Sequence, residues 1–185
     1  MKALTTLVIL GMTATAASAA SLDFSGVQGT NVGSFSVPGA TVTQESGGNL
    51  LVGTFCAGQV DGFCFVSPFG SGAAAGGTMD FTSAVTNLTF DIDGWNPGDS
   101  VTITAFDDLV ALGSSTFTAN GVVDFTGFAS ITSLLFVDNA SAGAGVGYST
   151  FEFDLADTAP IPLPAGGLLL LTALGGLALR KYKAA

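Results

Sequence analysis

The sequence predicts an all-β domain, built as an antiparallel β-sandwich or jelly roll. Short runs of alternating apolar and polar residues recur along its second half, separated by Gly, Asn, Asp and Pro. Between residues 20 and 160, no segment combines the 3.6-residue periodicity and the capping residues of a helix. This stretch of about 140 residues is long enough for one domain with its own core.

The alternation is clearest at residues 88–93, where every second residue is apolar and Asp91 and Asp93 point to solvent. A turn is expected at residues 94–99, before alternation resumes over residues 101–106. The spacing of turn residues predicts four further strands, at residues 110–118, 122–125, 131–137 and 148–155. Many short strands at near-regular spacing favour a sandwich.

A low-complexity run at residues 70–77, rich in Gly and Ala, is expected to be a surface loop. It would separate an N-terminal set of strands from the better-patterned C-terminal set.

The two ends of the chain differ from this domain. Residues 1–19 have the three parts of a secretory signal: the charge of Lys2, an apolar run over residues 3–12, and the cleavage pattern Ala17-Ser18-Ala19. We expect a signal peptide at 1–19, removed by signal peptidase after Ala19, and a β domain at 20–159.

Residues 160–185 form a C-terminal segment with a proline motif, an apolar run and a basic end. Counted from Ala165, the apolar run has 15 residues, about 22 Å as a helix against a hydrocarbon core of ~30 Å. Such a helix spans a membrane only with adjustment of the bilayer or its flanks. The basic residues that follow would stay cytoplasmic and so place the domain outside: Arg180, Lys181 and Lys183.

This order of features resembles the VPLPA-CTERM sorting signal, of the wider PEP-CTERM class of Gram-negative bacteria. The matching residues are Ile161, which replaces the usual valine, and Pro162, Leu163, Pro164 and Ala165. The resemblance implies an exosortase-type processing enzyme as partner. It also implies an inner-membrane-anchored precursor that is then delivered to the cell surface or the extracellular matrix. The strand pattern from residue 88, with its Trp95–Asp99 turn, is similar to β-sandwich domains that often precede such tails.

Charge is distributed unevenly along the chain. The formal net charge is −10, but all four Lys and Arg residues lie in the terminal segments, and all 14 acidic residues lie between residues 20 and 160. Nucleic-acid binding needs cationic groups that displace counterions, so it is excluded as a function. Divalent cations and neutral ligands are the partners that suit such a surface.

Cys56 and Cys64 are the only cysteines. In an exported protein they are expected to form a disulfide, which would stabilise the fold by about 2–3 kcal/mol in the chain-entropy model. A catalytic thiol would need a neighbouring cation or histidine, and the domain has neither.

Catalysis is restricted by the same composition, because a chain without His has no Ser-His-Asp chemistry. A carboxylate pair, as in glycoside hydrolysis, remains open. The candidate acids are Asp91, Asp93, Asp107, Asp108, Glu152 and Asp154. Two pairs among them, Asp91/Asp93 and Glu152/Asp154, have a spacing of two that places each pair on one face of a strand, alternating with Ile92 and Phe153. A solvated strand face is therefore favoured over a catalytic cleft, and no catalytic residue is assigned.

The sequence leads to two ligand hypotheses. A structural calcium site could combine Asp23, Asp138 and Glu152, and no other cofactor is expected. Trp95, in its turn, would either cover the end of the core, which is favoured, or stack on a neutral glycan.

The main functional prediction is therefore a non-enzymatic exported surface or matrix protein, in contact with extracellular polysaccharide. The alternative is a module that binds neutral carbohydrates. A carboxylate-based glycoside hydrolase ranks third.

Overall fold

The computed structural model of the chain describes residues 19–46, 48–53, 61–66, 75–95, 98–138 and 146–156. These residues form twelve β-strands, and every pairing between them is antiparallel. The predicted β-sandwich is confirmed. The helices expected in the signal peptide and in the C-terminal segment fall on residues 1–18 and 160–185, which lie outside the described residues, whereas Ala19 is in a β-strand. Within the described ranges, no helix long and apolar enough to cross a membrane is present.

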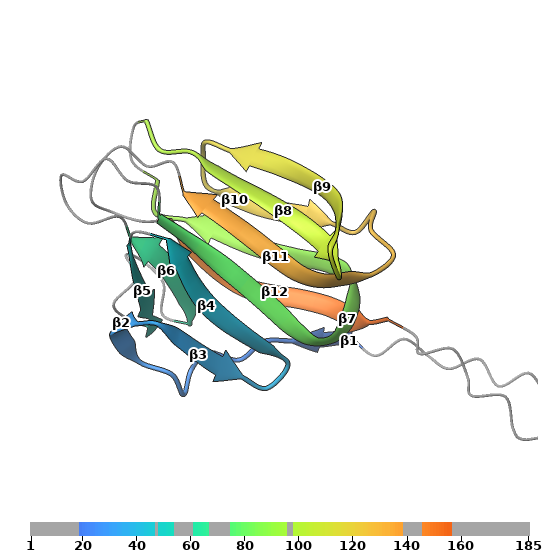
Figure 1. Cartoon of the computed structure of the whole chain (residues 1–185), viewed down its shortest axis with the longest axis horizontal. Coiled ribbons are helices and arrows are strands. Elements are labelled where there is room, and N and C mark those ends of the chain that lie inside the picture. The colour runs from blue at the N-terminus through green and yellow to red at the C-terminus, as the bar shows by residue number, and fades with distance from the viewer. Residues whose placement is uncertain are drawn as a thin grey trace, which may run out of the picture.

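The strands lie in two layers, shown in Figure 1. Layer 1 contains, in spatial order, β3 (Ser34–Val37), β4 (Ala40–Ser46), the first half of β7 (Ala75–Asp93), β11 (Ile131–Asp138), β8 (Val101–Asp107) and β9 (Val110–Phe117).

Layer 2 contains β2 (Gly29–Val32), β5 (Asn49–Val52), β6 (Gly62–Val66), β12 (Gly147–Leu155), the second half of β7 and β10 (Gly121–Phe125). The short strand β1 (Ala19–Ser21) pairs with the end of β12.

One strand, β7, belongs to both layers. Its first residues pair with β4 and β11, and its residues 85–93 pair with β12. Between these two parts, the ladder with β11 jumps from Asp80 to Val85. The strand therefore changes layers at residues 81–84, and all twelve strands form one continuous hydrogen-bonded sheet.

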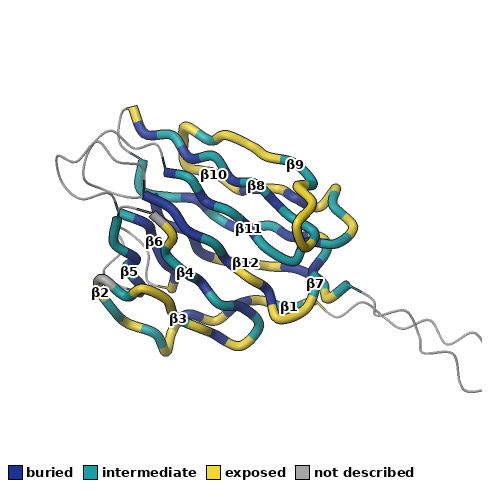
Figure 2. The backbone as a smooth tube through the Cα atoms, in the orientation of Figure 1, coloured by how far each residue is buried: buried dark blue, intermediate teal, exposed yellow. Residues whose placement is uncertain are grey.

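The core between the layers is dominated by aromatic rings. Phe63 on β6 is fully buried, and its ring centroid lies 5.3 Å from that of Tyr148 and 5.9 Å from that of Phe151. Phe151 in turn stacks on Phe90 of β7, with centroids 4.5 Å apart and rings 11° from parallel. Such pairs stabilise by about 0.5–1.5 kcal/mol beyond the area that they bury. Figure 2 shows the buried residues running along the middle strands of both layers.

The alternation read from the sequence is confirmed in the second half of the chain. On β7, Leu88, Phe90 and Ile92 are buried, while Asp91 and Asp93 lie on the outer face, half-buried. The observed bounds of β8 to β12 differ from the predicted ranges by at most one residue at each end.

The loop predicted at residues 70–77 is wrong for its last three residues. Ala75, Gly76 and Gly77 begin β7 and are buried. A Cβ atom at Gly77 would lie 2.1 Å from the carbonyl oxygen of Thr43 and 2.5 Å from the ring of Phe65. The glycines therefore let neighbouring strands approach closely, a use of glycine that composition alone does not distinguish from a loop.

Candidate functional site

The ladder between β7 and β12 contains two bulges. On β12, the buried residues Tyr148 and Phe151 are three positions apart, although regular alternation would place them on opposite faces. Thr150 takes up the extra residue: its φ is 52°, and the register shifts between Ser149 and Glu152. The bulge keeps both rings in the core and leaves Glu152 exposed on the outer face.

The second bulge lies on β7. Here Val85 and Leu88 are both buried and three positions apart, and Asn87 between them has a φ of 53°. The register shift on β12 between Glu152 and Asp154 marks the same point of the ladder. Asn tolerates this left-handed conformation better than most residues, whereas a β-branched residue such as Thr150 is strained by it.

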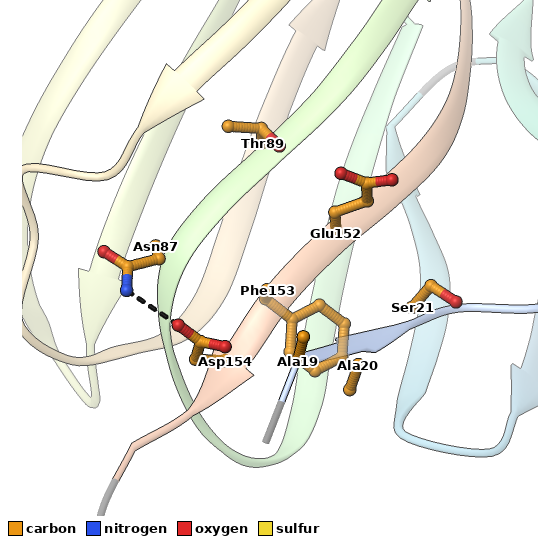
Figure 3. A pocket seen from close by; sticks show the side chains of 8 residues that line it. All are labelled: Ala19, Ala20, Ser21, Asn87, Thr89, Glu152, Phe153 and Asp154. Carbon is orange, nitrogen blue, oxygen red and sulfur yellow. Dashed lines mark hydrogen bonds between the residues drawn. The ribbon is translucent and has the colours of Figure 1, made fainter. Parts of the chain in front are cut away.

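Between the bulges, on the outer face of layer 2, the structure has an open cleft of about 430 Å³. Its walls come from β1, β7 and β12, which Figure 3 shows side by side. The polar residues that line it are Ser21, Asn87, Thr89, Glu152 and Asp154; Ala19, Ala20 and Phe153 complete the lining.

The cleft is rich in hydrogen-bond acceptors. Asn87 Nδ2 donates a hydrogen bond of 2.8 Å to Asp154 Oδ2, which fixes both side chains at one end (Figure 3). Glu152 is exposed and faces the same side as the half-buried Thr89. Ser21 is the register partner of Glu152. Carboxylate oxygens and hydroxyls that line one cleft suit a ligand that offers several hydroxyl donors.

The part of the outer face of layer 2 that β7, β10 and β12 form is acidic. The carboxylates on it, from β7, β10 and β12, are Asp91, Asp93, Asp124, Glu152 and Asp154. No Lys, Arg or His occurs in the described ranges, so no side-chain cation offsets this charge. An anionic ligand would be repelled from this face.

The residues predicted as calcium ligands are not brought together. Asp23 is exposed, and hydrogen bonds from the Ser25 hydroxyl and backbone N–H lower its pKa. Asp138 is fully buried at the end of β11, where its Oδ2 accepts a hydrogen bond of 3.4 Å from the Val146 N–H. Glu152 lies on the outer face of layer 2. Among the described residues, no group of three or more Asp, Glu, Cys or His side chains could hold a metal ion.

Trp95 lies in the turn after β7 and is partly buried against the core. Its indole Nε1 is buried without a hydrogen-bond partner, and its backbone N–H donates to Asn120 Oδ1 at 3.4 Å. This position favours the interpretation that Trp95 covers the end of the core. It does not line the cleft.

The remaining predicted residues are placed as follows. Asp107 and Asp108 lie at the turn between β8 and β9, away from the cleft. Cys64 is buried on β6 and is not a free thiol. Cys56, Ala17, the sorting motif 161–165 and the basic residues 180–183 lie outside the described residues, so the disulfide and both terminal signals stay predictions.

Sequence reasoning identified Glu152 and Asp154 as a pair on one strand face, which the structure confirms. It missed Asn87, Thr89 and Ser21. The sequence does carry a signal for Asn87, because the apolar residues Val85 and Leu88 on either side of it are three positions apart. Such a spacing breaks the alternation of a strand and indicates a bulge. Ser21 had no local signal, since it enters the cleft through the pairing of β1 with β12.

No family model and no curated protein matches this sequence. It is similar in structure to a family 11 carbohydrate-binding module from Clostridium thermocellum, solved in complex with a β-1,3-1,4-mixed-linked tetrasaccharide. The TM-score is 0.43 at 15% identity, over 77% of this chain and 98% of the module. A family 11 module of a cellulosomal cellulase from the same organism gives a TM-score of 0.42 at 15% identity, over 77% and 97% of the two chains.

Proposed function

We propose that this protein is a non-enzymatic exported surface protein that binds a neutral glycan in the cleft on layer 2. The observation that carries the proposal is the cleft itself, which is lined by two carboxylates, an amide and two hydroxyls on a face without cationic side chains. A neutral saccharide supplies the hydroxyl donors that these acceptors need, and hydrogen bonds to a charged acceptor contribute about 1.5–3 kcal/mol each.

The two bulges support the same location. A left-handed Thr costs of order 1–2 kcal/mol, and backbone strain of this kind is concentrated at binding sites. Here the strain lies at the ladder positions that orient Glu152 and border the cleft.

The test is titration of the full-length protein with neutral tetrasaccharides of glucose, mannose and galactose. Glu152→Gln, which keeps the shape and removes the charge, is expected to weaken binding about 10-fold or more. Thr89→Val removes one hydroxyl from a strand position and is expected to weaken it several-fold. Asp61→Asn removes an exposed carboxylate that does not line the cleft and serves as the matched control.

Binding that is unchanged in both cleft variants, or no binding by any sugar of the panel, would contradict the proposal. A reducing-end assay on the same samples separates binding from hydrolysis. Release of new reducing ends that disappears in Glu152→Gln would identify a carboxylate hydrolase instead.

The proposed localisation, export to the cell surface, rests on the sequence patterns at the two ends of the chain. Cleavage after Ala19 would remove only the first residue of β1 and leave Ala20 and Ser21 paired with β12. Mass spectrometry of the mature chain from its native host tests the proposal. We expect a chain that begins at Ala20 and lacks the basic end at 180–185; an intact basic end would contradict the sorting signal.

A further inference from the structure

A second hollow lies on the outer face of layer 1, next to the turn between β8 and β9. It has a volume of about 230 Å³, and we call it the groove. Three apolar side chains line it: Phe106 from β8, Leu135 from β11 and Leu109 from the turn. Phe106 and Leu135 are only half-buried, and Leu109 is 96% exposed.

The turn that presents Leu109 is held in place by hydrogen bonds. Asp108 has a φ of 51°, and its N–H donates to Thr132 Oγ1 at 2.6 Å. The same hydroxyl donates to the Phe106 carbonyl at 3.3 Å, and Ser130 Oγ donates to Asp107 Oδ1 at 3.2 Å. The exposed leucine therefore sits on a fixed support.

Polar side chains line the groove as well. Glu45 and Asp108 contribute carboxylates, and Thr78 and Ser133 contribute hydroxyls. An aromatic ring beside hydrogen-bond acceptors matches the two sides of a sugar ring, which offers C–H groups on its faces and hydroxyl donors at its rim. A phospholipid surface fits less well, because the described domain has no side-chain cation for its phosphates and the groove carries two carboxylates.

We propose that the groove is a second neutral-saccharide site. Since it lies on the layer opposite the cleft, one molecule would bridge two glycan chains. The ligand class rests on the proposed function, whereas the site is formed by different strands and different residues. Two sites on one rigid domain also raise the avidity for a long polymer, without any new contact.

The first experiment measures stoichiometry, by calorimetric titration of the full-length protein with the tetrasaccharide that binds best. Two sugars per chain are expected. Leu109→Ser combined with Phe106→Thr is expected to weaken one of the two sites at least 10-fold and leave the other unchanged. Leu109→Ser alone is expected to weaken binding at that site several-fold. Because the Leu109 side chain has almost no buried surface, this loss of affinity cannot come from unfolding.

The matched control is Val122→Ser. Val122 is an exposed apolar residue on β10 that lines neither hollow, with 61% of its surface accessible. It should leave both sites intact.

The second experiment measures bridging, by the turbidity and viscosity of a soluble neutral polysaccharide mixed with the protein. Wild type is expected to cross-link the polymer, whereas the groove double variant and Glu152→Gln should each abolish cross-linking.

The outcomes separate the two proposals. One sugar per chain, lost in Glu152→Gln and retained in the groove variants, would overturn the groove and leave the cleft. One sugar per chain, lost in Leu109→Ser and retained in Glu152→Gln, would support the groove and overturn the cleft. Concentration-dependent dimers in analytical ultracentrifugation that vanish in Leu109→Ser would assign the groove to a second copy of this chain and overturn the saccharide assignment. So would binding to phosphatidylcholine vesicles that vanishes in the same variant.

Discussion

The two outer faces of the sandwich follow from one rule of strand alternation and yet differ. In layer 1 the ladder of β7 with β11 runs in unbroken register from Ser133 to Asp138, and its outer face is rich in hydroxyls. Ser and Thr side chains from six strands lie on it: Ser34, Ser36, Thr41, Thr43, Thr78, Thr102, Thr104, Ser114, Thr116 and Ser133. In layer 2 the ladder of β7 with β12 is interrupted twice, and its outer face is acidic and hollowed. Layer 1 has register shifts as well, on β8 between Ala105 and Phe106 and on β4 between Gln44 and Ser46. The two interruptions of the β7–β12 ladder differ from these because they border the larger cleft.

The largest effect on stability is expected at Gly77, where β7 lies close to β4 in layer 1. Gly77→Ala places a Cβ atom 2.1 Å from the backbone oxygen of Thr43, which cannot move without breaking the β4–β7 ladder. We expect a loss of about 3 kcal/mol in the free energy of unfolding, measured by urea denaturation. Gly121→Ala on β10 is the control, because nothing lies within 4 Å of its Cβ position. Equal stability of the two variants would contradict the tight packing.

The second-largest effect on stability is expected at Tyr148, on the inner face of layer 2. The Tyr148 hydroxyl is buried without a hydrogen-bond partner, so Tyr148→Phe is expected to raise stability at pH 7 by about 1 kcal/mol. Burial and, second, the charge of Asp138 raise the pKa of Tyr148 well above its ordinary value.

The sign of the pH dependence follows from this direction. A raised folded-state pKa gives stability that is present below the unfolded pKa of about 10 and is lost as the pH rises toward the folded value. The wild type should lose up to about 1.4 kcal/mol per pH unit above pH ~10, and Tyr148→Phe should lack this slope. Urea denaturation between pH 7 and 11 measures it. Tyr182, the only other tyrosine, lies outside the described residues. The same alkaline slope in both proteins would refute the prediction.

A smaller effect compares the two bulges of layer 2. Thr150→Gly should stabilise by about 0.5 kcal/mol, as relief of about 1 kcal/mol of left-handed strain exceeds the added backbone entropy of glycine. Asn87→Gly should not stabilise, because Asn tolerates this φ and its hydrogen bond to Asp154 is lost. Thermal unfolding of both variants checks the order. A gain in Asn87→Gly equal to that in Thr150→Gly would show that the hydrogen bond contributes nothing.

The smallest expected effect concerns the pKa of Asp124 on β10, at the edge of layer 2. Hydrogen bonds from the Thr126 hydroxyl, at 2.7 Å, and its backbone N–H, at 2.9 Å, lower the pKa of Asp124. A depressed folded-state pKa gives stability that is present above the unfolded value of about 3.9 and is lost as the pH falls through the folded value. Thr126→Val should raise the pKa of Asp124 in an NMR titration and leave that of Asp23 unchanged. An unshifted Asp124 would contradict the role of the hydroxyl.

The strands of the second half were predictable, because alternation is a local property. Leu88, Phe90 and Ile92 identify the core face of β7 without any knowledge of its neighbours. The length of β7 was not predictable in the same way. Gly76 and Gly77 have the composition of a loop, and only their pairing with neighbouring strands shows that they belong to β7.

The cleft was predictable only in part, because it depends on which distant segments pair. Glu152 and Asp154 share a face by their spacing, but Ser21 reaches them across a separation of more than a hundred residues. The calcium hypothesis was weak for the same reason. It joined Asp23, Asp138 and Glu152 without a register to place them, and the fold separates them.

The position of β12 has a consequence for how the chain matures. β12 is the last of the described strands to be synthesised, yet it lies inside layer 2, between β7 on one side and β6 and β1 on the other. Until residues 147–155 arrive, Phe63 lacks the rings of Tyr148 and Phe151, and β1 has no partner. Non-local pairing of this kind forms more slowly than contacts between neighbouring residues. For an exported protein, as proposed here, this order is favourable, because the domain cannot complete its core until its last strand has also crossed the membrane.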